Sequence, residues 1–335
     1  MKKPNFPIVS ELKSKRLKFE YKASTLTWAW MKELREHDKT KRIYEVNPYV
    51  EVYLFRDGLY GLFAENLDGM GDVWMYLIVG SEKALLIDTA YGLGDLKGLC
   101  DELTGGKDLI VVNTHDHYDH AYGNCRFEKI YCHEHLVPYL ESQNEHMWDY
   151  LYDWNGDNIW VDYDKSDMPL FKKYEIVGVK DGYVFNLGGD HCIELIFTGG
   201  HAVGHAAFLD KKQRILFTGD NICSDVCGCG NIGVKRRGPF TEDMDLSVYR
   251  NNLKRLIDRM NEFDYIFPQH FINNIENNLL INILETLDKI IEDPDCYDYS
   301  TEKYTKQKNV KMIRYYKNVV GFTPVSYGYE KGENV

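Results

Sequence analysis

Asn113-Thr114-His115-Asp116-His117-Tyr118-Asp119-His120 follows directly on the apolar run Asp108–Val112, and the two together predict a strand that ends in a polar loop. Three imidazoles and two carboxylates lie within six consecutive residues of this stretch. Imidazole and carboxylate groups are common ligands of divalent metal ions in proteins. The concentration of both in one short loop is hard to explain without a metal, so we expect a metal site here.

The spacing within the cluster predicts more than one metal ion. An extended chain turns successive side chains to opposite faces, so His115, His117 and Asp119 can point to one side of the loop. In an extended chain, the side chain of His120 would point to the opposite side. If His120 is also a ligand, the chain must turn between Asp119 and His120, most simply by starting a helix there. The cluster would then serve two metal ions.

Length and charge restrict the class of protein. The chain has 335 residues, a formal net charge of −12 and eight cysteines scattered along it. This length suits two domains or one large α/β domain with extensions, and the negative charge disfavours a nucleic-acid partner. No apolar run approaches the roughly 20 residues that cross a bilayer, and Pro4 and Pro7 interrupt the N-terminus where a secretion signal would lie. We expect a soluble, cytoplasmic protein with reduced cysteines, a small-molecule substrate and no membrane partner.

The pattern of apolar residues divides the chain into an N-terminal extension (1–42), a central domain (43–292) and a C-terminal tail (293–335). Strands and helices alternate irregularly in the central domain, which suggests two sheets covered by helices. An aromatic-rich insert is expected at residues 133–167. Helices are expected at residues 94–103, 120–125, 245–260 and 275–291. In the tail, weak strand character is predicted at residues 319–322.

Further polar residues follow apolar runs elsewhere in the chain. Asp88 comes after Leu85-Leu86-Ile87, His201 after a strand that ends in Gly199-Gly200, and Asp220 after Phe217-Thr218-Gly219. His270 follows Ile266-Phe267-Pro268-Gln269. Strand ends are where open sheets place ligands, because the scaffold is rigid there and the loop backbone approaches closely.

Together these motifs resemble those of the metallo-β-lactamase superfamily, in the style of its glyoxalase II-like and lactonase-like hydrolases. They occur in the order that the family shows, between residues 88 and 270. The resemblance implies an α/β fold, a four-layer αββα sandwich of two mixed β-sheets flanked by helices. It covers the central domain from about residue 43, and a set of five motifs in one order is specific.

The resemblance also implies a role for each motif residue. The first metal ion would be held by His115, His117 and His201, and the second by Asp119, His120 and His270. Asp220 would bridge the two ions, and Asp88 would order the metal-binding loop. A ligand set of imidazoles and carboxylates without thiolate favours two Zn²⁺ ions, with Fe or Mn as alternatives.

The implied reaction is hydrolysis of a small ester, lactone or thioester by a hydroxide that bridges the two metal ions. Asp119 would be the catalytic residue that orients this hydroxide and passes a proton to the leaving group. Two alternatives stay open at this point. One is a mononuclear iron sulfur dioxygenase of the same superfamily, and the other is a metal-stabilised binding protein without turnover.

Departures from the family pattern bear on the substrate. True β-lactamases of the superfamily have Cys or Ser where this chain has Asp220, so antibiotic hydrolysis is disfavoured. The segment Cys227-Gly228-Cys229-Gly230-Asn231 resembles the Gly-Cys-Gly loop of glyoxalase II, but Asn231 stands where that family has Arg. Recognition of a glutathione thioester is therefore in doubt.

Six residues are candidates for binding the substrate. The alternative interpretations are a packed strand residue for His205, a solvated loop for the basic pair and ordinary packing for Tyr118. For Cys223, grouped with Cys227 and Cys229, the alternative to lining the pocket is a further metal site or a redox sensor. The aromatic insert itself fits either a lid over the metal ions or the contact of a homodimer. The candidates are Tyr118, His205, Cys223, Lys235, Arg236 and Trp148.

Overall fold

The computed structural model describes residues 35, 37–69, 72–223, 227–229, 238–304 and 311–329. Residues 1–34 and 36, most of the expected N-terminal extension, lie outside this description, as do Lys235 and Arg236. Within the described ranges, no helix is both long and apolar enough to cross a membrane.

An eight-stranded sheet comes first, with its strands in the order of the chain. Neighbours from β1 to β5 are antiparallel, and those from β5 to β8 are parallel. The strands are β1 (Arg42–Tyr44), β2 (Asn47–Arg56), β3 (Leu59–Glu65), β4 (Asp72–Val79), β5 (Lys83–Ile87), β6 (Asp108–Val112), β7 (Lys129–His133) and β8 (Glu175–Val179).

The second sheet has six strands in the order β15-β14-β12-β11-β10-β9. Its β12 and β14 are parallel, and the other neighbours are antiparallel. The strands are β9 (Val184–Asn186), β10 (Cys192–Phe197), β11 (Ala206–Asp210), β12 (Ile215–Phe217), β14 (Tyr265–Phe267) and β15 (Ile275–Glu276).

The two sheets pack face to face. In β5, Leu85 and Ile87 belong to the core between the sheets, whereas Leu86 belongs to the core under the helix on the outer face. This alternation is what a strand that is covered on both sides requires. Across the interface, the rings of Tyr76 and Phe217 are 4.9 Å apart between centroids.

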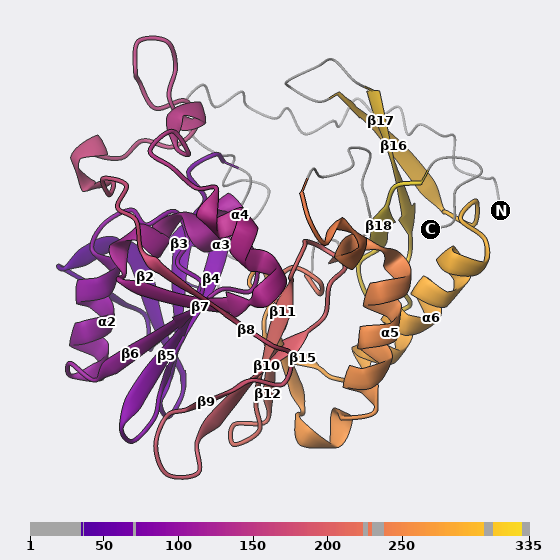
Figure 1. Cartoon of the computed structure of the whole chain (residues 1–335), viewed down its shortest axis with the longest axis horizontal. Coiled ribbons are helices and arrows are strands. Elements are labelled where there is room, and N and C mark those ends of the chain that lie inside the picture. The colour runs from indigo at the N-terminus through magenta and orange to yellow at the C-terminus, as the bar shows by residue number, and fades with distance from the viewer. Residues whose placement is uncertain are drawn as a thin grey trace.

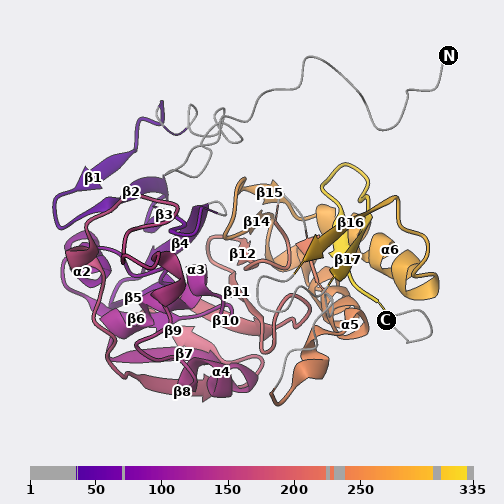
Figure 2. The same cartoon turned by 90° about the horizontal axis from the view of Figure 1, so that it is seen from above.

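Helices cover both outer faces, as Figures 1 and 2 show. On the first sheet lies α2 (Leu96–Thr104), and on the second lie α5 (Leu246–Ile257) and α6 (Leu279–Glu292). Helices α3 (Tyr118–Ala121) and α4 (Val137–Glu141) are short. The αββα sandwich expected from the sequence is confirmed.

A third, smaller sheet was not expected. Its strands are β13 (Cys227–Gly228), β16 (Tyr299–Tyr304), β17 (Lys311–Lys317) and β18 (Val325–Tyr327), in the order β13-β18-β17-β16. It lies beside α6, with Val325 and Tyr327 in the core under α5 and α6. The predicted strand at residues 319–322 is wrong, because that segment is a turn between β17 and β18.

The predicted helix at residues 275–291 is wrong in its first turn. Ile275 pairs with Ile266 as part of β15, and α6 begins only at Leu279. The segment at 133–167 lies between β7 and β8 and contains α4 and short 3₁₀ turns. Three expectations stay predictions. They are the role of residues 133–167 as a separate insert, the boundaries of the N-terminal extension and the C-terminal tail, and a homodimer contact.

Candidate metal centre

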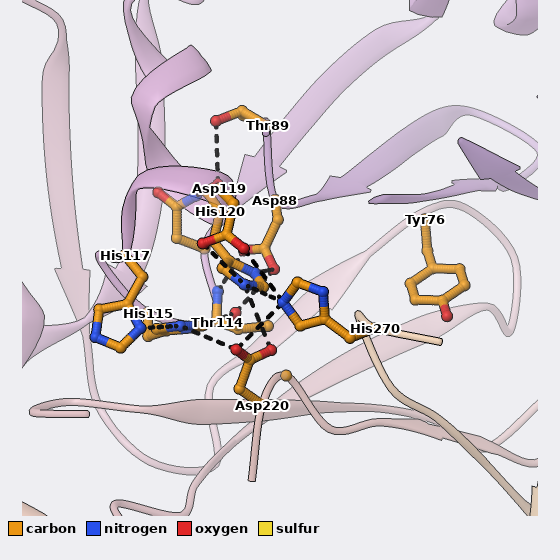
Figure 3. Close-up of polar contacts among 12 residues, drawn as sticks. Tyr76, Asp88, Thr89, Thr114, His115, His117, Asp119, His120, Asp220 and His270 are labelled. Atoms are coloured by element: carbon orange, nitrogen blue, oxygen red, sulfur yellow. Dashed lines mark hydrogen bonds and ion pairs between the residues drawn. The ribbon is translucent and has the colours of Figure 1, made fainter. Parts of the chain in front are cut away.

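Loops at the ends of strands from both sheets bring the predicted metal ligands together. His115, His117, His201 and Asp220 form one group, and Asp119, His120 and His270 form a second. In each group, the atoms that could bind a metal lie within 4.8 Å of one another. All seven predicted ligands are therefore placed in two adjoining groups. Figure 3 labels six of them, all except His201.

The first group is built around His117. Its Nδ1 lies 3.0 Å from Nε2 of His115 and 3.0 Å from Nε2 of His201. Asp220 completes the group, with Oδ2 at 3.6 Å from Nε2 of His201 and 3.9 Å from Nε2 of His115. Three nitrogens and a carboxylate oxygen thus face a common centre.

The second group also brings imidazole nitrogens and a carboxylate oxygen to a common centre. Nε2 of His120 lies 3.2 Å from Nε2 of His270, and Nε2 of His270 lies 3.3 Å from Oδ2 of Asp119. Helix α3 begins at Tyr118, one residue before Asp119, which is earlier than the turn expected from the sequence. This turn sends Asp119 and His120 to the second group while His115 and His117 stay in the first.

Asp220 lies between the two groups. Its Oδ2 is 3.3 Å from Nε2 of His270, and its Oδ1 is 3.4 Å from Nε2 of His120. The Oδ1 atom of Asp220 is buried, and no group among the described residues donates a hydrogen bond to it. A buried carboxylate oxygen without a donor is costly unless a cation binds it. The position of Asp220, in reach of both groups, fits a carboxylate that two cations would share.

The buried carboxylate of Asp88 fixes one histidine in each group. Its Oδ2 accepts from the Thr114 hydroxyl at 2.8 Å and from Nδ1 of His120 at 3.0 Å. Because the Thr114 hydroxyl donates to Asp88, it accepts from Nδ1 of His115, which lies 2.9 Å away. Both imidazoles therefore carry a proton on Nδ1 and turn Nε2, the atom that would bind a metal ion, toward the centre.

Backbone carbonyls fix two more of the imidazoles in the same way. Nδ1 of His201 donates to the carbonyl of Gly228 at 2.7 Å, and Nδ1 of His270 donates to the carbonyl of Asp72 at 2.6 Å. His117 differs from the others, because its Nδ1 faces the centre. The histidines are thus held in the tautomers that a metal ion needs.

These residues fit a pair of divalent metal ions. In the first group, the Nε2 atoms of His115 and His201 carry no proton and both lie 3.0 Å from Nδ1 of His117, so a cation can sit among the three nitrogens. In the second group, the Nε2 atoms of His120 and His270 lie 3.2 Å apart, and a cation there would replace the protons that the neighbouring carboxylates keep on these rings. Tetrahedral Zn²⁺ with bonds of about 2.0–2.1 Å to nitrogen places its ligands about 3.3 Å apart, which is close to these separations. The donor set of imidazole and carboxylate also suits Fe and Mn.

Charges differ between the two groups in the absence of metal. Burial holds the pKa of His115 well below its usual range, and it lowers the pKa of His201 to about 4. Burial also opposes protonation of His120, but Asp220 and Asp119 outweigh it and raise the pKa of His120 to about 10. Metal binding to the second group therefore has to release a proton from His120.

Asn66 is a site residue that sequence reasoning missed. It follows β3, is buried, and donates from Nδ2 to Oδ2 of Asp119 at 2.8 Å. An asparagine before Asp68-Gly69 is typical of a turn, so the sequence carries no signal for this contact.

Comparison with known proteins agrees with this geometry. The family model described as "Metallo-beta-lactamase superfamily" matches residues 68–270, which is more than half of the chain. The chain belongs to this superfamily. The family predicted from the sequence motifs is therefore confirmed.

Curated proteins that resemble the chain include two named as thioesterases. Human acyl-coenzyme A thioesterase MBLAC2 is 26% identical over 183 residues, which are 49% of this chain and 63% of that protein. Atrochrysone carboxyl ACP thioesterase of Aspergillus chevalieri is 28% identical over 198 residues, 58% of this chain and 50% of that protein. The chain thus matches less than two thirds of the length of either relative.

Among solved structures, a metallo-beta-lactamase from Pontibacter korlensis superposes with a TM-score of 0.50 at 19% identity. The match covers 71% of this chain and 99% of that one. At this identity the likeness concerns the metallo-beta-lactamase fold alone.

The predicted substrate residues of this superfamily member lie in different surroundings. Tyr118 is half-buried, with its ring 6.4 Å from that of His117 between centroids. Cys223 is buried and its Sγ donates to the Asp220 carbonyl at 3.5 Å, which places it against the backbone of Asp220. Trp148 is buried in an aromatic cluster that includes Tyr122. Lys235 and Arg236 lie outside the described residues.

His205 is buried behind the metal centre rather than in front of it. Its Nδ1 lies 2.8 Å from the Thr198 hydroxyl, and its Nε2 accepts from the backbone nitrogen of Asp220 at 3.3 Å. Gly219 packs on this ring with φ of +55°, and a Cβ at this position would lie 2.4 Å from Nε2 of His205. His205 therefore supports the backbone of Asp220 and so helps to position its carboxylate.

Proposed function

We propose that the protein is a dinuclear zinc hydrolase that cleaves a small acyl thioester, within the broader class of esters, lactones and thioesters. The observation that carries this proposal is the pair of adjoining ligand groups with Asp220 between them. In outline, a thioester and water give a carboxylic acid and a thiol. A pair of divalent ions, when bound, supplies carbonyl polarisation and a water nucleophile at neutral pH.

Asp119 is the residue that we assign to proton transfer. Burial disfavours its charged form, but His120 and His270 outweigh burial and hold the pKa of Asp119 well below its usual range. Asn66 fixes the carboxylate by donating to Oδ2. An ionised, oriented carboxylate at the edge of the centre can accept a proton from water and deliver it to the leaving group.

A thioester suits this site better than an ester. Thiols have a pKa of about 8.5, so a thiolate leaves without a strong acid to protonate it. An ionised Asp119 can give the leaving group only the proton that it has first taken from the attacking water, and a thiolate can leave without waiting for that proton. The two relatives named as thioesterases support the same choice.

The experiment is a substrate panel with zinc-loaded protein. We expect acyl thioesters to be hydrolysed faster than matched oxygen esters, lactones and β-lactams. Asp119→Ala should abolish this hydrolysis, whereas Asp162→Ala, which removes an exposed carboxylate, should leave it unchanged. A panel that stays inert with two zinc ions bound, or a single bound iron with consumption of oxygen, would contradict the proposal.

A further inference from the structure

A row of aromatic side chains runs outward from the metal centre along the segment between β7 and β8. Ring centroids of His117 and Tyr118 are 6.4 Å apart, those of Tyr118 and Tyr150 are 6.0 Å apart, and those of Tyr150 and Trp160 are 6.2 Å apart. These separations lie within the range of direct ring contacts. The row therefore connects a residue of the first metal group to the distal part of this segment.

This row, made of Tyr118, Tyr150 and Trp160, forms the more accessible side of a larger aromatic cluster. On its buried side lie Tyr91, Trp148 and Leu151. Tyr118 and Trp160 are only half-buried, and Tyr150 is 38% exposed. Single exposed aromatic residues are common, but contiguous ones next to a reactive centre mark a binding surface.

The hydroxyl of Tyr150 is already engaged within the cluster. It forms a hydrogen bond of 3.1 Å with the hydroxyl of the buried Tyr91. This contact ties the polar end of Tyr150 to the buried side. The hydroxyl of Tyr118 is likewise engaged, by the carboxylate of Asp68. What the row offers a ligand is therefore ring faces and edges.

We propose that Tyr118, Tyr150 and Trp160 form a subsite for an aromatic acyl group, with the carbonyl of that group at the metal centre. This inference rests on the proposed thioester hydrolysis. The row starts one ring contact from His117, so it meets the part of the substrate next to the reacting carbonyl. Aromatic rings prefer offset or edge contacts with other rings, which an aliphatic chain does not offer.

The test compares two thioesters that differ only in the ring. Phenylacetyl and cyclohexylacetyl thioesters of N-acetylcysteamine share the leaving group and the number of carbons. The cyclohexyl group is at least as apolar, so burial alone gives no preference for phenyl. Ring contacts predict that kcat/KM for the phenylacetyl thioester is higher by about 2- to 10-fold. A ratio of one or below would overturn the subsite.

Variants within the segment between β7 and β8 test whether the preference for the phenylacetyl thioester comes from the row of rings. Tyr150→Leu and Trp160→Leu should each bring the ratio toward one. Trp154→Leu is the matched control, because Trp154 belongs to the same segment and is 92% exposed. The ratio is taken within one protein, so partial misfolding lowers both rates and leaves the ratio intact. An unchanged ratio in both row variants, or an equal loss in the control, would contradict the proposal.

Direct binding separates this inference from the proposed function. Phenylacetate and cyclohexylacetate are titrated into zinc-loaded protein by calorimetry. If no thioester is hydrolysed, the proposed function fails, yet tighter binding of phenylacetate that is lost in Trp160→Leu still supports the subsite. If thioesters are hydrolysed but the two acids bind equally, the subsite fails and the hydrolase proposal stands.

Discussion

Oδ2 of Asp88 lies 3.0 Å from Nδ1 of His120, and both side chains are fully buried. Through the Thr114 hydroxyl the same carboxylate also orients His115. One carboxylate thus sets the tautomer of a ligand in each metal group.

Asp88→Asn should weaken metal binding by about 10- to 100-fold, the usual effect of losing such an orienting group. Asparagine tolerates the left-handed backbone that Asp88 adopts, with φ of +63°, so the loop keeps its shape. An asparagine side chain has two orientations here. In one, its NH₂ group faces Nδ1 of His120 and favours the wrong tautomer of that ring. In the other, its NH₂ group faces the backbone nitrogen of Thr114, which then has no acceptor. Zinc affinity from competition with a chelator checks this. Thr114→Ser keeps the hydroxyl and should retain most of the affinity; equal affinity in Asp88→Asn would refute the role.

Asn66→Ala should lower affinity for one of the two metal ions by about 10-fold. The change removes the donor that holds Oδ2 of Asp119, and Asp119 belongs to the second group only. A two-site calorimetric titration resolves the two binding events. Asn155→Ala, which truncates an exposed asparagine, serves as the control. The interpretation fails if both events weaken equally or neither changes.

Gly219→Ala should destabilise the protein more than an ordinary glycine replacement. The added Cβ would lie 2.4 Å from Nε2 of His205, so His205 and the backbone of Asp220 must move. Gly105→Ala is matched in φ, at +67°, but its Cβ meets no atom within 4 Å. Overpacking should make the Gly219 variant less stable than the Gly105 variant by about 1–3 kcal/mol in urea unfolding. An equal loss of stability in the two variants would show that backbone strain, and not contact with His205, determines the effect at Gly219.

His133 should make stability fall in mild acid. Burial, reinforced by nearby His135, lowers the pKa of His133 to about 4, below the usual value of about 6.5 for an unfolded chain. As pH falls from about 6.5 to about 4, the unfolded state binds the proton first, so the free energy of unfolding decreases. His133→Phe removes this titration and keeps a ring against Phe197. Relative to pH 8, the variant should gain about 1–3 kcal/mol over wild type at pH 4; parallel pH profiles would exclude the effect.

The convergence of the seven candidate ligands was predictable from the sequence, because each follows an apolar strand that fixes where its loop begins. Asp220 and His270, for example, follow β12 and β14, which are parallel neighbours and so end at the same edge of the sheet. Asn66 was not predictable, because its contact with Asp119 depends on how two loops distant in sequence meet.

Parts of the fold were missed for a similar reason. Strands β16 and β17 are rich in tyrosine, lysine and other polar residues and lack a clear apolar alternation, so pairing between them, not local pattern, makes them strands. Ile275 fits the apolar period of the helix that follows it, but pairing with Ile266 extends it into β15. In both places, tertiary contacts override the local signal.

Counting bound metal tests the central claim most directly. Zinc-loaded protein, measured by mass spectrometry under non-denaturing conditions, should carry two ions per chain. His201→Ala and His270→Ala each remove a ligand from a different group and should each leave one ion bound. A wild-type protein that holds a single ion, lost in both variants alike, would contradict the arrangement of two groups that share Asp220.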